Sequence, residues 1–135
     1  MLKNIPILIT EDTLSYQKYA SDLTESWGMR PLLASDGAEA VAIAARHEIA
    51  ICMMDIQMPR MNGFESASRI RMQTGYKFPI IAVTALGPSV REECLQCGMD
   101  DYLQKPYEDA DLKALLTQWL MIYQKTQASG KKTIQ

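Results

Sequence analysis

Five short apolar runs recur along the chain, and an amphipathic stretch follows each of them. The runs occupy residues 5–10, 30–34, 49–55, 78–84 and 101–105. They are mostly apolar without strict alternation, which is typical of strands that are covered on both faces, as in a parallel sheet. The pattern therefore predicts five strands.

The stretches after the strands carry apolar residues at helical spacing. The first runs from Tyr16 to Trp27 and stops at Gly28, because glycine commonly follows the last residue of a helix. The second, residues 35–46, opens with Asp36 as its cap candidate and has Glu39 three residues later, which resembles a capping box. Three further helices are predicted over residues 64–72, 89–97 and 109–123.

The order of these elements predicts an α/β fold in which helices cover both faces of a doubly wound, five-stranded parallel sheet. Pro31 removes a hydrogen-bond donor from the second strand, so that strand belongs at an edge. The flavodoxin-like strand order 2-1-3-4-5 places it there. Residues 1–123 are expected to form this single domain, and the polar, aperiodic residues 124–135 a flexible tail or linker.

The composition narrows the possible classes of protein and leaves the predicted fold unchanged. The chain has 135 residues, 47% of them hydrophobic and 22% charged, as expected of one globular domain. A formal net charge of −2 gives no field that would attract nucleic acid or an anionic membrane. No leader or membrane-length apolar run is visible, and three cysteines, an odd number, favour a reducing compartment. We therefore expect a cytoplasmic location.

Reactive side chains stand where the predicted strands end. The first strand is followed by Glu11 and Asp12, the third by Asp55, and the fourth and fifth end at Thr84 and Lys105. In a sheet of this order, ligands bind beyond the carboxyl ends of the strands, between strands 1 and 3. Three carboxylates, a hydroxyl and an ammonium are therefore expected to meet at one edge of the sheet.

Three carboxylates in one crevice would raise one another's pKa values unless a cation lay between them. Mg²⁺ suits this place, because it takes oxygen ligands and can bind carboxylates together with a phosphoryl group. A carboxylate that attacks phosphorus forms an aspartyl phosphate. Lys105 would then neutralise charge on the phosphoryl oxygens, and Thr84 would donate a hydrogen bond to one of them.

Four motifs at these strand ends resemble the response-regulator receiver domain of two-component and phosphorelay signalling. They are "ITED" (9–12), "MMDIQMPRMNGFE" (53–65), "VTA" (83–85) and "DDYLQKP" (100–106). The resemblance covers residues 5–122 and is strongest to the receivers of hybrid sensor histidine kinases. It implies a receiver fold with the 2-1-3-4-5 order, for which a chemotaxis member of the family is an established example.

The resemblance also implies which residues would bind the metal and the phosphoryl group. Asp55 would be the phosphoacceptor, and Glu11 and Asp12 would hold Mg²⁺ (or Mn²⁺), Asp12 more directly. Gln57 would add its backbone carbonyl to the metal.

Three further residues would respond to the phosphoryl group. Thr84 and Lys105 would contact it, and Tyr102 would occupy the aromatic switch position. In the family the peptide bond that corresponds to Lys105–Pro106 is cis, which proline makes accessible. Receivers of hybrid kinases often carry asparagine at the positions of Thr13 and Tyr16, so contacts between the first helix and a partner are expected to differ here.

The implied function is that of a switch rather than of an enzyme acting on other molecules. A histidine kinase or a histidine phosphotransfer domain would supply the phosphoryl group. A homodimer through residues 89–97, 101–105 and 109–123 is a second implied partner, and neither nucleic acid nor a membrane is contacted directly. The domain would stand alone as a response regulator or form the cytoplasmic part of a membrane-bound hybrid kinase.

Other functions fit the sequence less well. An aspartate-nucleophile phosphatase of the haloacid dehalogenase type needs a second aspartate two residues after the first, where this chain has Gln57. A receiver-like binding module without chemistry is disfavoured because Asp12, Asp55, Thr84 and Lys105 are all present. A flavin or nucleotide binder would need a glycine-rich phosphate loop, which the chain lacks after strands 1 and 3.

Two motifs are interpreted as structural. Cys94 and Cys97 have the spacing of a redox or zinc pair, but they lie late on a predicted helix without a second pair, which favours small buried hydrophobes. His47 falls near the end of the second helix, where a cation complements the helix dipole.

Overall fold

Five parallel strands form one sheet in the order β2-β1-β3-β4-β5, which confirms the predicted topology. The strands are β1 (Pro6–Thr10), β2 (Arg30–Ala34), β3 (Ile51–Met54), β4 (Ile80–Thr84) and β5 (Asp101–Gln104). The computed structural model describes the backbone of residues 2–134 and the side chains of residues 2–125. Pro31 lies on the edge strand β2, opposite Ile7 of β1, as the sequence predicts.

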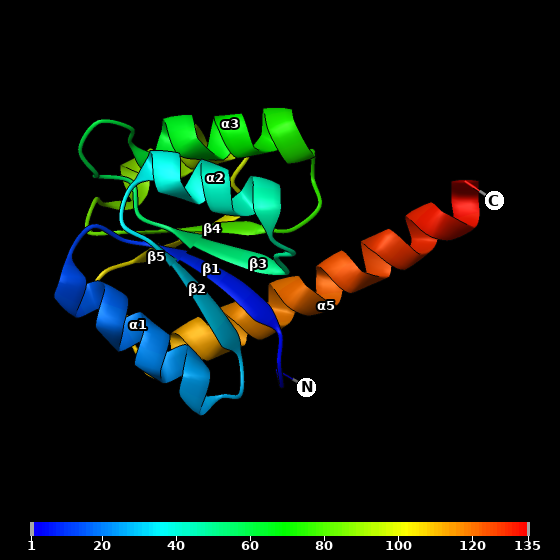
Figure 1. Cartoon of the computed structure of the whole chain (residues 1–135), viewed down its shortest axis with the longest axis horizontal. Helices are drawn as coiled ribbons and strands as arrows, with labels where there is room; N and C mark the ends of the chain where they lie inside the picture. The colour runs from blue at the N-terminus through cyan, green and yellow to red at the C-terminus, as the bar shows by residue number, and fades with distance from the viewer. Residues whose placement is uncertain (1, 135) are drawn as a thin grey trace.

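Helices cover both faces of the sheet (Figure 1). They are α1 (Leu14–Ser26), α2 (Gly37–Arg46), α3 (Gly63–Thr74), α4 (Arg91–Gln96) and α5 (Asp109–Ile134), and a 3₁₀ turn (Pro88–Val90) leads into α4. Helices α2 and α3 lie on one face, and α1 and α5 lie on the other. This is the doubly wound arrangement that the alternation of elements predicts.

A separate hydrophobic core forms on each face of the sheet. Leu8 and Met54 pack with α2, α3 and α4, whereas Ile7, Ile9 and Met53 pack with α1 and α5. Neighbouring residues of a strand point to opposite faces. Because both faces are covered, every position of β3 and β4 is buried. Their sequences are continuous apolar runs for this reason.

Side-chain caps fix the starts of two helices next to the site. The Asp36 carboxylate accepts a hydrogen bond of 2.8 Å from the Glu39 N–H, which confirms Asp36 as the cap of α2. The Asn62 side chain caps α3 in the same way, at 3.0 Å from the Glu65 N–H. Each cap satisfies a backbone donor that the first turn of a helix cannot pair internally.

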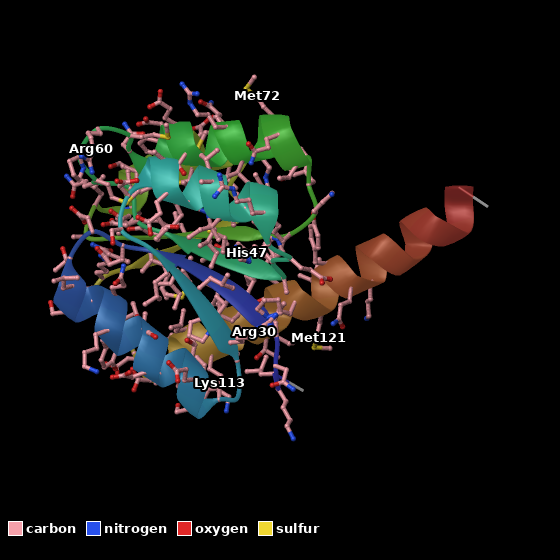
Figure 2. The ribbon with its side chains drawn as sticks, viewed as in Figure 1. Arg30, His47, Arg60, Met72, Lys113 and Met121 are labelled. Carbon is pink, nitrogen blue, oxygen red and sulfur yellow. The ribbon has the colours of Figure 1, made fainter. Side chains whose placement is uncertain are left out.

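The loop that joins β3 to α3 is tied to α2 by an ion pair. Arg60 lies at the carboxyl edge of the sheet, and Asp36 Oδ2 accepts a hydrogen bond of 2.8 Å from its guanidinium (Figure 2). His47 lies toward the other end of α2, where it is the residue that ends the helix. Its place confirms the structural interpretation of this histidine.

Two predicted elements differ clearly from those observed, whereas the ends of most others shift by only one or two residues. The helix predicted over residues 89–97 is a 3₁₀ turn followed by a six-residue helix, Arg91–Gln96, because Pro88 and its neighbours form a tighter first turn. Residues 124–134, predicted to be an aperiodic tail, continue α5 in the structure. Extending a formed helix costs much less than starting one, so a polar segment without its own apolar stripe can still follow. Residue 135 lies outside the described residues.

Candidate functional site

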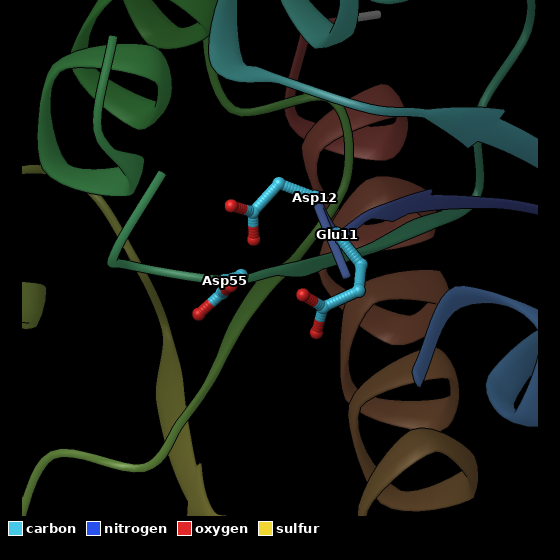
Figure 3. Close-up of side chains that lie close together, drawn as sticks. All are labelled: Glu11, Asp12 and Asp55. Carbon is cyan, nitrogen blue, oxygen red and sulfur yellow. The ribbon is translucent and has the colours of Figure 1, made fainter. Parts of the chain in front are cut away.

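Three carboxylates meet at the carboxyl edge of the sheet. Because β1 and β3 are hydrogen-bonded neighbours, with Thr10 opposite Met54, the residues that follow them emerge side by side. One carboxylate oxygen from each of Glu11, Asp12 and Asp55 lies within 4.8 Å of the other two. Figure 3 shows the three side chains directed toward a common space. The predicted convergence of these residues is confirmed.

Burial makes this cluster electrostatically unfavourable without a cation. Asp55 is 6% exposed and Glu11 is 5% exposed, whereas Asp12 lies at the exposed rim. Burial first, and then the charge of Glu11, raise the pKa of Asp55 to about 7, while Lys105 acts in the opposite direction. At neutral pH the carboxylate form of Asp55 therefore needs a positive charge beside it.

Lys105 supplies part of that charge. Its side chain is 8% exposed, forms an ion pair with Glu11, and lies 3.8 Å from the Asp55 Oδ2 atom. The Lys105–Pro106 peptide bond is cis, as the sequence analysis expects. The Lys105 backbone N–H donates to the Thr84 carbonyl oxygen at 2.8 Å, which fixes the end of β5 against the end of β4.

Thr84 and Tyr102 are linked through one residue, Leu86. The buried Thr84 Oγ1 accepts a hydrogen bond of 3.2 Å from the Leu86 N–H. The Tyr102 hydroxyl donates to the Leu86 carbonyl oxygen. A displacement of the Thr84 hydroxyl would therefore also disturb Leu86, whose carbonyl oxygen accepts the hydrogen bond from the Tyr102 hydroxyl.

An open hollow lies beside Asp12, the exposed member of the three carboxylates. Its volume is about 490 Å³, and its lining includes Asp12, Gln57 and Leu86. Gln57, two residues after Asp55, is exposed at the rim of this hollow.

The oxygens of the three carboxylates fit a hard divalent cation, for which such oxygens are the preferred ligands. Within the described residues they form the one group with the spacing of metal ligands. One Glu11 oxygen bonds to Lys105, and the other accepts a hydrogen bond of 3.1 Å from the Thr13 N–H. Both oxygens of Glu11 are thus engaged, which leaves Asp12 and Asp55 as the better direct ligands.

Two supporting residues were missed by the sequence analysis. A Cβ atom at Gly63 would lie 2.1 Å from the Asp55 carbonyl oxygen, so only glycine lets α3 begin this close to Asp55. The Gln17 amide donates to the backbone carbonyls of Glu11 and Ala34, which holds the start of the acidic loop. The only sequence signal for Gly63 was its place in "MNGFE", and no local pattern identified Gln17.

The cysteine pair lies apart from this cluster. Cys94 is buried in the core, and burial raises the pKa of its thiol to about 11. Burial also raises the pKa of the half-buried Cys97 thiol. Because thiolates are the reactive and metal-binding form, these environments oppose redox or zinc chemistry, in agreement with the structural interpretation of the pair.

Comparisons with known proteins agree with the fold. The family model of the response regulator receiver domain matches residues 7–117. The osmosensing histidine protein kinase SLN1 of Saccharomyces cerevisiae is 34% identical over 136 residues, which span 96% of this chain and 11% of that protein. Histidine kinase 3 of Arabidopsis thaliana is 33% identical over 129 residues, spanning 78% of this chain and 12% of the kinase. The chain thus spans a small part of the length of these relatives.

A solved structure resembles the whole sheet-and-helix arrangement. The receiver domain of sensor histidine kinase PA1611 from Pseudomonas aeruginosa is 38% identical, with a TM-score of 0.81. The match covers 87% of this chain and 98% of that domain. The PA1611 structure has a magnesium ion coordinated in its active-site cleft.

Proposed function

Because the chain belongs to the response regulator receiver domain family of two-component signalling, we propose that Asp55 accepts a phosphoryl group from a phosphohistidine. The donor would be a histidine kinase or a histidine phosphotransfer domain. One observation carries this proposal above the others. Asp55 directly follows the central strand β3, is buried, and lies close to both the ammonium of Lys105 and the acidic pair Glu11 and Asp12.

The transfer is a displacement at phosphorus. A carboxylate oxygen of Asp55 forms a bond to the phosphorus atom, and the bond from phosphorus to the donor's imidazole nitrogen breaks. The imidazole leaves with the electron pair of that bond and takes up a proton from solvent. The product is an aspartyl phosphate, and no oxidant or further reactant is needed.

The residues around Asp55 would each compensate part of the negative charge on the carboxylates and the phosphoryl oxygens. Asp12 and Asp55 would bind Mg²⁺ or Mn²⁺ directly, together with the backbone carbonyl of Gln57. Glu11 would stabilise the bound cation through its negative charge without being a direct ligand. Bound there, the cation would neutralise the carboxylates and the phosphoryl oxygens. Lys105 would move from Glu11 to a phosphoryl oxygen, and Thr84 would donate a hydrogen bond to another.

The phosphoryl group would act on partners through Thr84 and Tyr102. It adds a charge of roughly −1.5 to −2 and new acceptor oxygens. If Thr84 turns toward those oxygens, its hydrogen bond with Leu86 is lost and the Tyr102 ring can turn inward. The surface of α4, β5 and α5 would repack, and this surface is where a homodimer or another partner would respond.

The domain would work in the cytoplasm, free or as part of a longer hybrid kinase. None of the helices that the structure describes is long and apolar enough to cross a membrane. Residues 1–123 would form the functional unit, with residues 124–135 as a connecting segment. As a phosphoacceptor, the domain would promote only its own phosphorylation and dephosphorylation.

Incubation with phosphoramidate or acetyl phosphate tests the acceptor directly. The purified chain should gain one phosphoryl group in Mg²⁺, seen as a slower band on a phosphate-affinity gel and removed by hydroxylamine, which cleaves acyl phosphates. Asp55→Asn should abolish the band, whereas Asp12→Ala should weaken it and raise the Mg²⁺ concentration required. Labelling of the Asp55→Asn variant at the wild-type level, or wild-type labelling in excess chelator, would contradict the proposal.

A further inference from the structure

The side chain of Tyr16 lies over the ammonium group of Lys105. Tyr16 is in the first turn of α1, and the centre of its ring is 4.3 Å from Lys105 Nζ. Tyr16 is 41% exposed, whereas the side chain of Lys105 is 8% exposed. One part of the ring therefore faces solvent while its inner face covers the lysine.

Three side chains surround the ammonium of Lys105, and the ring of Tyr16 is one of them. An ammonium has three N–H donors. The Lys105 ammonium bonds to Glu11, lies 3.8 Å from Asp55, and faces Tyr16 on a further side. The space lined by these residues and Tyr107 is about 10 Å³, about the smallest cavity that holds one water. Tyr16 thus occupies the side from which water would otherwise solvate the ammonium.

An aromatic face attracts a cation, and the attraction grows as water is excluded. The ring of Tyr16 therefore favours the position of Lys105 beside Asp55 over positions in which its flexible chain points to solvent. Glu11 alone would not enforce this choice, because Lys105 must leave it to reach a phosphoryl oxygen. The ring would stay in contact with the ammonium during such a short movement.

We propose that Tyr16 is a positioning residue for Lys105. Its ring holds the ammonium at the acceptor, so that the lysine is already placed when a phosphoryl group arrives. This inference rests on the proposed function of Asp55. Receivers of hybrid kinases often carry asparagine at this position. The proposal gives the tyrosine found here a physical role within the site.

The affinity for beryllofluoride, a phosphoryl analogue, measures this role in the presence of Mg²⁺. Tyr16→Phe keeps the aromatic face and should bind the analogue like the wild type. Tyr16→Leu keeps an apolar side chain without that face and should bind about two- to tenfold more weakly. Phenylalanine analogues with one, two and three ring fluorines at position 16 should weaken binding stepwise, because fluorine withdraws charge from the face while the shape changes little.

Tyr19→Leu is the matched control. Tyr19 lies on the same helix and is 47% exposed, but its ring contacts Tyr107 and its hydroxyl bonds to Asp109 instead of facing Lys105. This variant should bind beryllofluoride like the wild type. Equal affinities of the Tyr16→Leu and wild-type proteins, or fluorinated variants without a trend, would overturn the role of Tyr16 while leaving the function of Asp55 intact.

A second measurement needs no phosphoryl analogue. The ring current of Tyr16 should shift the Lys105 ε-methylene protons upfield in the NMR spectrum of the unliganded protein, and Tyr16→Leu should remove that shift. A wild-type protein that shows the upfield shift but binds no beryllofluoride would refute the phosphoacceptor function and would retain the contact. Lys105 protons at their ordinary shift in the wild type would refute the positioning of Lys105 by Tyr16.

Discussion

The charge of Asp55, the proposed phosphoacceptor, is costly to the stability of the fold. Its pKa is raised to about 7 by burial and by Glu11. A carboxyl group whose pKa is higher in the folded protein than in the unfolded chain destabilises the fold as pH rises between those two values. The folded domain therefore carries an unfavourable charge at neutral pH.

Asp55→Asn should stabilise the domain in excess chelator. The free energy of unfolding should rise by about 1–3 kcal/mol near pH 8, since the full shift corresponds to about 4 kcal/mol and neighbouring groups relax. The gain should shrink as pH falls from about 7 to about 4 and vanish below about 4, where the wild-type carboxyl becomes protonated in the unfolded chain as well as in the folded protein. Urea unfolding at several pH values, followed by circular dichroism, measures it. A variant less stable than wild type at pH 8 would show that the Asp55 charge does not destabilise the folded domain.

Leu86 should control how long the phosphoryl group survives. It lines the hollow that also contains Asp12 and Gln57. We expect the water that attacks phosphorus to come from this hollow. Gln57 can hydrogen-bond a water, and Leu86 cannot. Leu86→Glu should shorten the half-life of the aspartyl phosphate about fivefold, the effect of one hydrogen bond of about 1 kcal/mol.

Release of phosphate from the labelled protein gives this half-life. Leu86→Met is the control, because it changes the shape of the side chain but adds no group that positions water. Equal half-lives for the Leu86→Glu variant and the wild type would assign the rate to another residue.

At the scale of elements, β5 connects the site to the surface of α4 and α5. The Trp119 indole N–H of α5 donates to Asp101 Oδ2 at 2.8 Å, and Asp101 Oδ1 accepts the Tyr102 N–H at 2.8 Å. Arg91 of α4 lies 3.6 Å from Asp101 Oδ1. One carboxylate therefore joins three elements directly beside the residue proposed to switch.

Trp119 should report the switch by fluorescence. In a Trp27→Phe background it is the remaining tryptophan. Mg²⁺ with beryllofluoride should shift its emission, because inward rotation of Tyr102 would displace Asp101. Tyr102→Ala should abolish the shift without preventing binding of the analogue, measured separately by calorimetry. Unchanged emission in a protein saturated with the analogue would contradict coupling through β5.

The order and type of the elements follow closely from the sequence, whereas several contacts of the site do not. Continuous apolar runs and a proline in the second strand were enough to determine the sheet order, because parallel strands leave few alternatives. The acidic residues were identifiable because they stand directly after strands. Tyr16, Gln17 and Gly63 reach the site through tertiary packing and a close backbone approach, which no local pattern encodes.

At the scale of the molecule, the two cores determine how much of the chain the domain needs. Leu112, Leu116 and Leu120 of α5 are buried against the sheet. Gln124 and Lys125 are exposed. The part of α5 that stabilises the domain therefore ends near Tyr123.

A chain that ends at Tyr123 should fold and accept a phosphoryl group like the full chain, with a Tm within about 2 °C of it. A chain that ends at Gln118 loses the buried Leu120 and the half-buried Trp119, and its Tm should fall by more than about 10 °C. Thermal denaturation and the labelling assay measure both properties. A large loss of stability in the longer of these two chains would extend the domain beyond residue 123.

The course of α5 also determines how the domain can be attached to something else. The chain enters β1 and leaves along α5 at the same end of the strands (Figure 1). The three carboxylates follow the carboxyl ends of β1 and β3 and so lie at the opposite end. A polypeptide, a label or a solid support joined to either terminus is therefore separated from Asp55 by about the length of a strand. The domain can be anchored at both ends like an insert within a longer chain, and the proposed phosphoacceptor would still be accessible to a donor.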